Sequence, residues 1–211
     1  MNEEGTIEKV LKNVKKYVDE IILIDDGSTD NTKKIAKKYA TIISNKENVG
    51  YSNSLNKGFE LATKKEFDVI ITLDADGQHL PSDIPKMTKP VIQGKADIVV
   101  GRRPYKARLM ESVFAIFGRK RGVHDPLCGM KAYSHEVYER FGFFDNINSI
   151  GTQLTFAALK QGFRVQEKNI KLKRREDVPR FGRKIKANFK LLLAYIRLIR
   201  YLKGDTHGNR D

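Results

Sequence analysis

The sequence FDVIITLDADGQH, residues 67–79, decides the fold of this chain. The β-branched and aliphatic run at 69–73 is typical of a buried strand in a parallel sheet. It ends in two carboxylates, Asp74 and Asp76, with Gln78 close behind. Open α/β sheets bind ligands at the carboxyl ends of strands, and oxygen ligands favour Mg²⁺ or Mn²⁺ that bridges to phosphate. The stretch therefore indicates a metal and phosphate site, and a strand followed by an Asp/Gly turn is the alternative.

Strands and helices alternate through the first hundred residues. Short apolar runs of strand length are separated by segments whose apolar residues recur at helical spacing. This alternation implies one α/β domain with a mostly parallel sheet and right-handed crossovers. The first strand also ends in carboxylates, Asp25 and Asp26. Strands are expected at 20–24, 41–44, 69–73 and 97–100, and helices have apolar faces at 7–14, 35–39, 55–62 and 84–91, the first capped by Asn2.

The net charge of +14 is concentrated toward the C-terminus. Residues 160–211 hold 16 Lys and Arg against 5 Asp and Glu. This excess suits nucleic acid, an anionic membrane surface or phosphorylated substrates, and a Lys-rich solvated surface is the alternative.

The single cysteine, Cys128, excludes an internal disulfide and is expected to be an inert small residue. No apolar run approaches the roughly 18 residues of a membrane span, and the start is unlike a signal peptide.

Two basic segments also carry apolar helical patterns. Residues 102–124 hold seven Lys and Arg against Glu111 alone. They predict either an ordinary helix packed on the core or a segment that meets a lipid-like acceptor. Residues 183–203 predict an amphipathic helix that lies on an anionic membrane surface or in the core. We expect a domain at 1–182 before this helix and a disordered tail at 204–211 after it. Its apolar stripe consists of Ile185, Phe189, Leu192, Ile196 and Ile199.

Several short motifs occur along the chain in an order and spacing that agree with one protein family. They are Asn2-Glu3-Glu4, residues 25–32, Asn48-Val49-Gly50 with Lys57-Gly58, residues 74–79, Gly101-Arg102-Arg103, Asp125-Pro126 with Gly129-Met130-Lys131, and the basic loop at 175–184. With this set the chain resembles the family 2 glycosyltransferases of GT-A fold, most closely the polyprenyl or dolichyl phosphate mannosyl- and glucosyltransferases. Each motif alone is weak, and the ordered set is strong. The resemblance implies a Rossmann-like sheet flanked by helices.

The resemblance also implies a role for each group of site residues. Carboxylates accept hydrogen bonds from base N–H groups and sugar hydroxyls, and the residues implied in nucleotide-sugar binding are Glu3, Ile24, Asp26, Asp74 and Lys184. A cation, Mg²⁺ or Mn²⁺, would neutralise the leaving nucleoside diphosphate, and its implied ligands are Asp74, Asp76 and Gln78. Cationic side chains would grip the diphosphate or an acceptor phosphate, and the implied catalytic residues are Asp76, Arg102, Lys131 and Arg175.

The implied reaction is an inverting transfer of a hexose from a donor such as GDP-mannose or UDP-glucose. A phosphate acceptor is ionised at pH 7, whereas a hydroxyl acceptor needs a basic carboxylate. Between Gly101 and Asp125 only Glu111 offers one. This favours a polyprenyl or dolichyl phosphate acceptor, with the protein cytoplasmic and peripheral at the cytoplasmic membrane face. A saccharide hydroxyl acceptor, an inactive truncated relative and a basic nucleic-acid-binding protein are the alternatives, the last disfavoured because aromatic residues lie away from the basic runs.

Three departures from the family bear on these expectations. The family's first strand lies centrally in the sheet and ends in Pro-x-Tyr-Asn-Glu, but here Met1 stands at the Tyr position; either the start is misplaced or the strand is absent. The acidic residues of many relatives are replaced at 150–153. Many lipid-phosphate transferases carry transmembrane helices after the domain, and none is expected within residues 183–211, which agrees with the soluble subgroup. His79 and His124 are expected as surface loop residues, since no second histidine sits at metal-ligand spacing.

Overall fold

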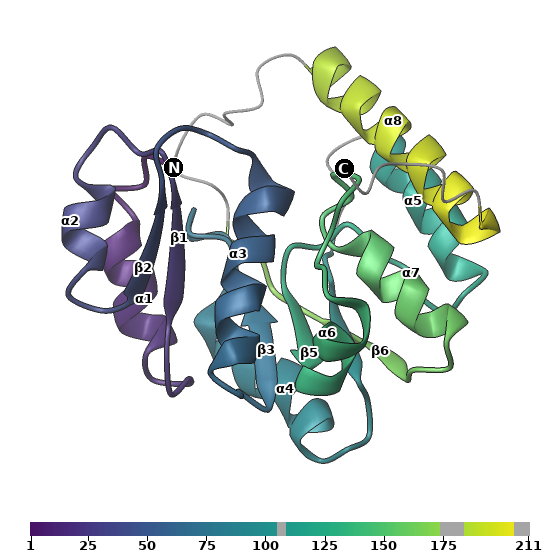
Figure 1. The fold of residues 1–211 in the computed structure, drawn as a ribbon, viewed down its shortest axis with the longest axis horizontal. Coiled ribbons are helices and arrows are strands. Elements are labelled where there is room, and N and C mark those ends of the chain that lie inside the picture. Colours follow the sequence, from purple (N-terminus) through teal and green to yellow (C-terminus); the bar gives the residue numbers. More distant parts are fainter. Residues whose placement is uncertain (105–108, 174–183, 205–211) are drawn as a thin grey trace.

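The computed structural model describes residues 1–104, 109–173 and 184–204, and these residues form two sheets (Figure 1). One sheet pairs β1 Ile22–Asp26 with β2 Thr41–Asn45 in parallel. The other has the order β3-β5-β4-β6, from β3 Val69–Thr72, β4 Ile98–Arg102, β5 Lys131–Ser134 and β6 Val165–Asn169. β6 is parallel to β4, while β5 runs antiparallel to β3 and β4. The chain is α/β as expected, with mixed strand pairing.

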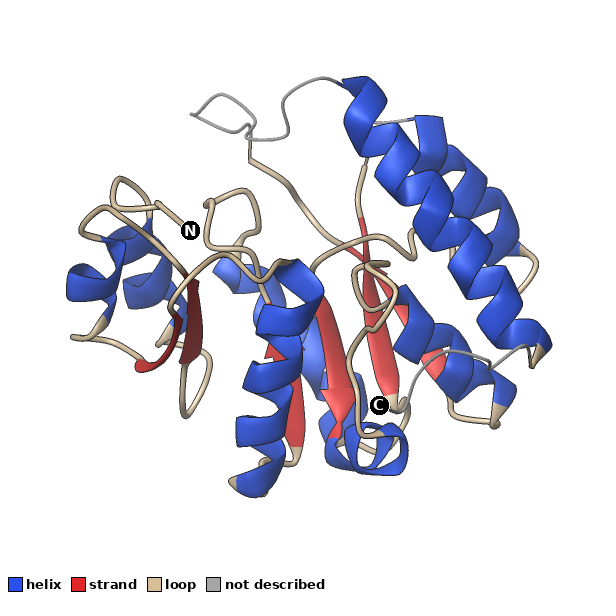
Figure 2. Cartoon of the chain, turned by 45° about the horizontal axis from the view of Figure 1, so that its top comes forward, coloured by secondary structure: helices blue, strands red, loops and turns tan. Residues whose placement is uncertain are grey.

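Helices flank both sheets (Figure 2). α1 forms because its apolar residues recur at i, i+3, i+4 and i+7, and all four are buried. Thr6 rather than Asn2 precedes its first turn, so the expected Asn2 cap is wrong; Asn2 bonds instead to the loop after β1. The helices are α1 Ile7–Val14, α2 Thr32–Ala36, α3 Tyr51–Lys64, the 3₁₀ turn η1 Pro81–Asp83, α4 Ile84–Ile92, α5 Leu109–Arg119, α6 His135–Phe141, α7 Thr152–Lys160 and α8 Lys184–Lys203.

Helices α1 and α3 join the two sheets. Val10 and Val14 of α1 belong to the main core, while Ile7 and Leu11 belong to a smaller core beneath β1 and β2. Phe59 of α3 stacks on Phe144 at 4.9 Å between ring centroids and meets Tyr133 of β5 edge-on at 5.3 Å. On the other side of α3, Gly58 lies so close to β1 that an added Cβ would come within 3.0 Å of Ile24 Cδ1. The two sheets are therefore held in one body by helices rather than by strand pairing.

The division between the sheets falls between β1 and β3. Within the described ranges β1 pairs only with β2, and β3 pairs only with β5. The first regular element is α1, so no strand precedes it among the residues the structure describes.

Strand β5 was not expected, because residues 124–131 read as a loop and no strand followed. It occupies the position between β3 and β4, and its Ala132 and Tyr133 are fully buried. The Thr72 hydroxyl at the end of β3 donates to the Gly129 carbonyl at 2.6 Å. The entry of β5 therefore brings the 125–131 loop to the end of β3, beside Asp74.

α5, α7 and α8 form a helical layer beyond β6. Tyr195 of α8 meets Phe114 and Phe117 of α5 edge-on, at 5.4 and 5.7 Å. The face of α8 that packs inward carries Ala187, Leu191, Ala194 and Leu198. This is not the expected stripe, whose Phe189, Leu192 and Ile196 are exposed. No helix in the described ranges combines the length and apolar character needed to cross a bilayer.

Candidate functional site

The N-terminal segment lies along the loop that follows β1. The Asn2 amide donates to Ser28 Oγ at 2.9 Å, and the Glu3 amide donates to Thr32 Oγ1 at 2.7 Å. Asp30 accepts from the Glu4 amide at 3.2 Å. Although partial burial acts to raise the pKa of Asp30, the bonds from Thr32 and Glu4 outweigh it and lower that pKa. Two of the expected motifs therefore form a single hydrogen-bonded unit.

Thr6 connects that unit to the turn after β3. Its hydroxyl donates to the Ala75 carbonyl at 3.0 Å, between the two aspartates of the metal motif. The same hydroxyl lies 3.4 Å from Glu3 Oε2. The structure thus brings together residues 2–6, 25–32 and 74–78, which contain all or part of three predicted motifs, at 2–4, 25–32 and 74–79, that are far apart in sequence.

Asp26 ends β1 and is held by the turn at residues 48–50. Its Oδ1 accepts from Asn45 Nδ2 at 3.0 Å and from the Val49 amide at 2.9 Å, and its Oδ2 accepts from the Gly50 amide at 3.1 Å. Burial alone would raise the pKa of Asp26, but these hydrogen bonds together lower it. Asp26 is therefore a fixed carboxylate with room for a further donor.

Asp74 and Asp76 follow β3 in a turn that leaves both side chains partly accessible. The Asp74 side chain is 37% exposed, and Asp76 Oδ1 accepts from the Gln78 amide at 3.0 Å. His79 corrects the sequence expectation, because it is only 5% exposed rather than on the surface. Its Nδ1 has no hydrogen-bond partner in the described structure and lies 3.7 Å from Asp74 Oδ2. A small movement of Asp74 would let this histidine orient the carboxylate.

Gly129 forms the other wall at Asp74. A Cβ atom on Gly129 would stand 2.6 Å from Asp74 Oδ2, closer than such atoms approach in proteins. Only glycine leaves the carboxylate its present position. Sequence reasoning placed Gly129 in a motif without a role, and the glycine itself was the signal of a close approach.

Lys131 turns inward rather than toward open solvent. It is 1% exposed, and its Nζ donates to the carbonyls of Cys128 at 2.7 Å and Ile150 at 2.5 Å. Burial lowers the pKa of Lys131 to about 8. Cys128 is equally buried, which raises the pKa of its thiol to about 12 and fits the expectation of an inert residue. Lys131 therefore ties together two loops behind the site.

Arg102 and Arg103 have different surroundings at the end of β4. Arg102 is exposed, whereas Arg103 forms a two-pronged ion pair with Asp125, at 2.7 and 2.8 Å, and contacts Glu111 at 3.2 Å. Burial acts to lower the pKa of Arg103, but the bond and charge of Asp125 outweigh it and raise that pKa. The loop continues to Glu167 of β6, which accepts from the amides of residues 124 and 125 and lies 2.6 Å from His124 Nδ1.

The remaining predicted residues lie in or beside the basic loop. Arg175 is outside the described residues, and Lys184 begins α8 with a side chain that is also outside them. The segment leading to this loop is attached to the metal motif. The Lys173 amide donates to the Gln78 carbonyl at 2.9 Å, and His79 forms a β-bridge with Leu172. The proposed contacts of Arg175 and Lys184 with phosphate stay predictions.

The side-chain oxygens after β3 are of the kind that bind a small divalent cation, with phosphate oxygens completing the coordination of the ion. Within the described ranges no three His, Cys, Asp or Glu side chains converge as a complete metal cage. Two carboxylates and an amide oxygen leave the other positions of a six-coordinate ion to water and phosphate, as Mg²⁺ prefers. The buried Nδ1 of His79 adds a group that can hold Asp74 in place.

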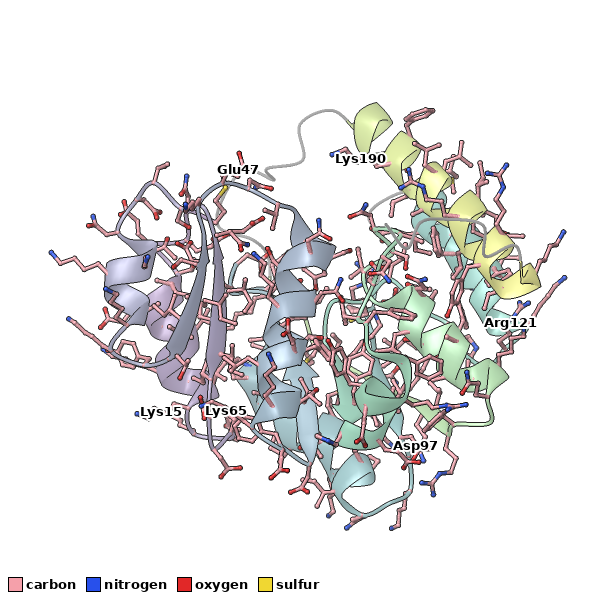
Figure 3. The ribbon with its side chains drawn as sticks, in the orientation of Figure 1. Lys15, Glu47, Lys65, Asp97, Arg121 and Lys190 are labelled. Atoms are coloured by element: carbon pink, nitrogen blue, oxygen red, sulfur yellow. The ribbon has the colours of Figure 1, made fainter. Side chains whose placement is uncertain are left out.

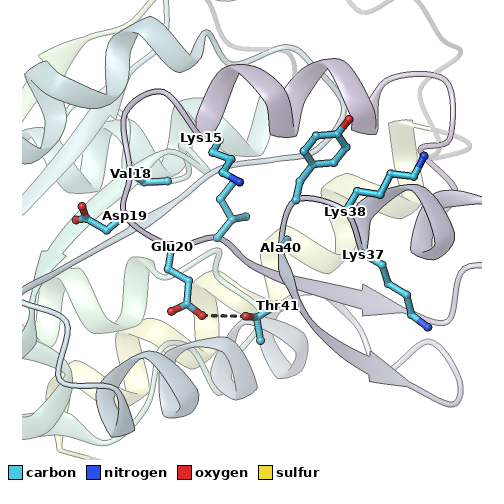
Figure 4. A pocket seen from close by; sticks show the side chains of 10 residues that line it. Lys15, Val18, Asp19, Glu20, Lys37, Lys38, Ala40 and Thr41 are labelled. Carbon is cyan, nitrogen blue, oxygen red and sulfur yellow. Dashed lines mark hydrogen bonds between the residues drawn. The ribbon is translucent and has the colours of Figure 1, made fainter.

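A pocket of about 310 Å³ lies at the opposite end of β1 from Asp26 (Figure 4). Among its lining side chains, Glu20 accepts from Thr41 at 2.9 Å and pairs with Lys65. None of the predicted site residues lines it. We therefore propose that the site lies at the carboxyl ends of β1 and β3, where the predicted motifs meet.

The arrangement of sheets and helices is that of the GT-A fold. The structure of glucosyl-3-phosphoglycerate synthase from Mycobacterium tuberculosis, solved with Mn²⁺, uridine diphosphate and glucosyl-3-phosphoglycerate, matches this fold with a TM-score of 0.72. The two sequences are 20% identical, and the match covers 92% of this chain and 76% of that one.

Sequence comparison identifies the family. The Glycosyl transferase family 2 model matches residues 1–142, and the chain belongs to this family. An uncharacterized protein of Methanocaldococcus jannaschii is 30% identical over 191 residues, 80% of this chain and 83% of that protein. The polyprenol monophosphomannose synthase of Mycolicibacterium smegmatis is 27% identical over 180 residues, 74% of this chain and 67% of the synthase. The protein is therefore a glycosyltransferase.

Proposed function

We propose that the protein transfers a hexose from a nucleotide sugar to a polyprenyl-type lipid phosphate, with inversion at the anomeric carbon. The observation that carries this proposal is the meeting of segments 2–6, 25–32 and 74–78 at the carboxyl ends of β1 and β3. The similarity to a polyprenol monophosphomannose synthase supports the acceptor class.

The nucleotide would lie against the end of β1. Asp26 is a fixed carboxylate that can accept a base N–H or a ribose hydroxyl. Glu3 is held at the loop that follows β1, where its amide donates to Thr32, and Ile24 forms the adjoining part of β1 against α3. GDP-mannose and UDP-glucose both fit this description.

The diphosphate would lie at the end of β3. Mg²⁺ or Mn²⁺, when bound, supplies neutralisation of the charge that develops on the leaving nucleoside diphosphate. Asp74, Asp76 and Gln78 would hold it, with Asp74 beside Gly129 and with His79 Nδ1 3.7 Å from its carboxylate. We assign Arg102, Arg175 and Lys184 to phosphate binding. Lys131 contributes by fixing the loop that carries Gly129.

The carboxylates on the acceptor side support a phosphate rather than a hydroxyl acceptor. A hydroxyl needs a general base, but Asp125 and Glu111 are buried against Arg103. Asp145 is fully buried and accepts from Ser52 Oγ at 2.7 Å and from the Ser149 amide at 2.6 Å. A phosphate monoester arrives already ionised, so these engaged carboxylates are no obstacle. Such an acceptor also places the protein at a membrane surface, and we propose the cytoplasmic face.

A transfer assay with labelled sugar tests the proposal. Purified protein is incubated with labelled UDP-glucose or GDP-mannose, Mn²⁺ or Mg²⁺, and a polyprenyl phosphate, and the product is partitioned between chloroform and water. We expect label in the organic phase for one donor, lost with chelator and with Asp76→Asn. If the label enters only a water-soluble glycan or phosphoglycerate product, the lipid phosphate acceptor is wrong and the acceptor is a hydroxyl group.

A further inference from the structure

The exposed large apolar side chains of this protein gather on one helical layer. Ten such side chains are exposed in the described part of the chain, and six of them lie on α5 and α8. Single exposed apolar residues are ordinary on protein surfaces, but a contiguous group marks a binding surface. The six are Leu109 and Ile116 of α5, and Phe189, Leu192, Leu193 and Ile196 of α8.

α8 has two apolar stripes on opposite sides. At about 100° per residue, Leu191, Ala194 and Leu198 share the side that packs on α5 and α7. Phe189 and Ile196 fall on the other side, so core packing does not explain them. Phe189 is 58% exposed and Ile196 is 41% exposed. A helix that needed only to cover the core would carry polar residues there.

The same layer is strongly cationic. α8 contains no Asp or Glu, and the only carboxylate of α5 is Glu111, which is buried and paired with Arg103. The two helices run side by side in the same direction, because the Met110 amide meets Asn188 near their starts and Phe117 meets Tyr195 further along (Figures 1 and 3). The exposed cations on and just after these helices are Lys190, Arg197, Arg200 and Lys203, and Arg119, Lys120 and Arg121.

We propose that this α5/α8 surface docks the enzyme on an anionic lipid bilayer. The apolar side chains would enter the boundary between head groups and acyl chains, while the cations meet the head groups. The inference rests on the proposed function, since it explains how a lipid phosphate is presented. α5 follows β4 after only residues 103–108, so the surface begins close to the chain segment that carries Arg102.

Charge distinguishes the bilayer from other occupants. Pairing two copies through this surface would bring like charges together, which costs free energy. Nucleic acid would satisfy the cations but leave six apolar side chains uncovered. An anionic bilayer complements both the cations and the apolar side chains, and each long cationic side chain can reach the head groups from the side of its helix.

Vesicle sedimentation of the full chain tests the docking surface. Phosphatidylglycerol-containing vesicles are compared with pure phosphatidylcholine vesicles, for the wild type and for Phe189→Ser/Leu193→Ser. Because both side chains are exposed, we expect this variant to fold normally and to lose at least about tenfold in partitioning. Ile92→Ser is the matched control, since Ile92 of α4 is 70% exposed outside the layer, and it should partition like the wild type.

The charge component has its own variant pair. Arg200→Ser should weaken binding to anionic vesicles about fivefold and leave binding to neutral ones unchanged. Lys34→Ser, at an exposed position of α2, should have no effect. Vesicle binding that stays at the wild-type level in both Phe189→Ser/Leu193→Ser and Arg200→Ser would overturn the proposal. So would a change from oligomer to monomer in Phe189→Ser/Leu193→Ser with unchanged vesicle binding, because the surface would then belong to a second copy.

Activity separates this inference from the proposed function. If both hold, Phe189→Ser/Leu193→Ser keeps wild-type transfer to a short-chain, water-soluble polyprenyl phosphate and loses transfer to a long-chain acceptor embedded in vesicles. If vesicle binding depends on this surface but no polyprenyl phosphate accepts sugar, the docking surface is supported and the proposed lipid acceptor is wrong. Transfer to both acceptors that is unaffected by the variant would sustain the acceptor and refute the docking surface.

Discussion

Replacing Gly129 by alanine tests whether the position of Asp74 controls cation and nucleotide binding. The new Cβ would stand 2.6 Å from Asp74 Oδ2, and contacts under 3.0 Å force a shift. The atom that gives way is the end of a side chain, so the backbone can stay in place. The carboxylate must therefore move by at least about 0.4 Å, which is twice the roughly 0.2 Å tolerance of metal–ligand distances.

Two effects of this substitution then differ in size. Loss of glycine restricts the unfolded chain, which stabilises by about 0.4–1 kcal/mol and offsets most of the crowding. The unfolding free energy should change by less than about 1 kcal/mol. Mn²⁺-dependent affinity for the sugar nucleotide should fall at least about tenfold, equivalent to about 1.4 kcal/mol.

Calorimetric titration of the nucleotide sugar, with Mn²⁺ and with chelator, measures this difference. Gly5→Ala is the matched control, because a Cβ on Gly5 meets nothing within 4 Å. Asp74→Ala sets the affinity expected when the carboxylate is lost entirely. Wild-type affinity in a folded Gly129→Ala protein would refute the argument that Asp74 must stand where it does.

Three further substitutions test the framework around the site. Lys131→Met removes a buried amine whose pKa in the folded protein is about 8, against an ordinary value of 10.5. Between pH 8 and 10.5 the unfolded wild type binds more protons than the folded one. The unfolding free energy of the wild type should therefore rise with pH by about 3 kcal/mol relative to the variant. Urea unfolding from pH 7 to 11 checks it, and parallel curves would contradict it. Arg103→Met removes the cation that pairs with the buried carboxylates of Asp125 and Glu111, and should cost about 3–5 kcal/mol by the same assay. Gly151→Ala places a Cβ 2.6 Å from the Phe144 ring at φ +69° and should cost at least about 2 kcal/mol, whereas Gly142→Ala, at φ +68° with open space, should cost about 1.

Local pattern was sufficient where one element determines its own environment. The apolar spacing of Ile7, Val10, Leu11 and Val14 predicted α1 and its buried face, and the aliphatic run at 69–73 predicted β3. The carboxyl ends of β1 and β3 belong to different sheets, and the contacts that join residues 2–6, 25–32 and 74–78 bring these two ends together.

Tertiary context decided the features that the sequence did not predict. β5 is Lys-Ala-Tyr-Ser, too short and too polar at its start to show an alternating pattern, and its antiparallel insertion follows from the space between β3 and β4. The outer stripe of α8 was recognised, but periodicity cannot decide which of two apolar stripes faces the core. His79 is buried because Leu172, nearly a hundred residues later, pairs with it.

The burial of two cations bears on how the leaving group is stabilised. Lys131 and Arg103 both stand in motifs that the family resemblance connects with phosphate, yet each is committed to the protein: Lys131 to two carbonyls, and Arg103 to buried carboxylates. Turning either toward a diphosphate would leave those groups unpaired in a poorly solvated interior, at a cost of several kcal/mol. Their contribution to catalysis is therefore to hold the 125–131 loop, and with it Gly129, against Asp74. In the proposed reaction the charge of the leaving diphosphate would then be met by a cation at Asp74 and Asp76, together with Arg102, Arg175 and Lys184. We therefore expect the geometry at the end of β3 to govern the rate.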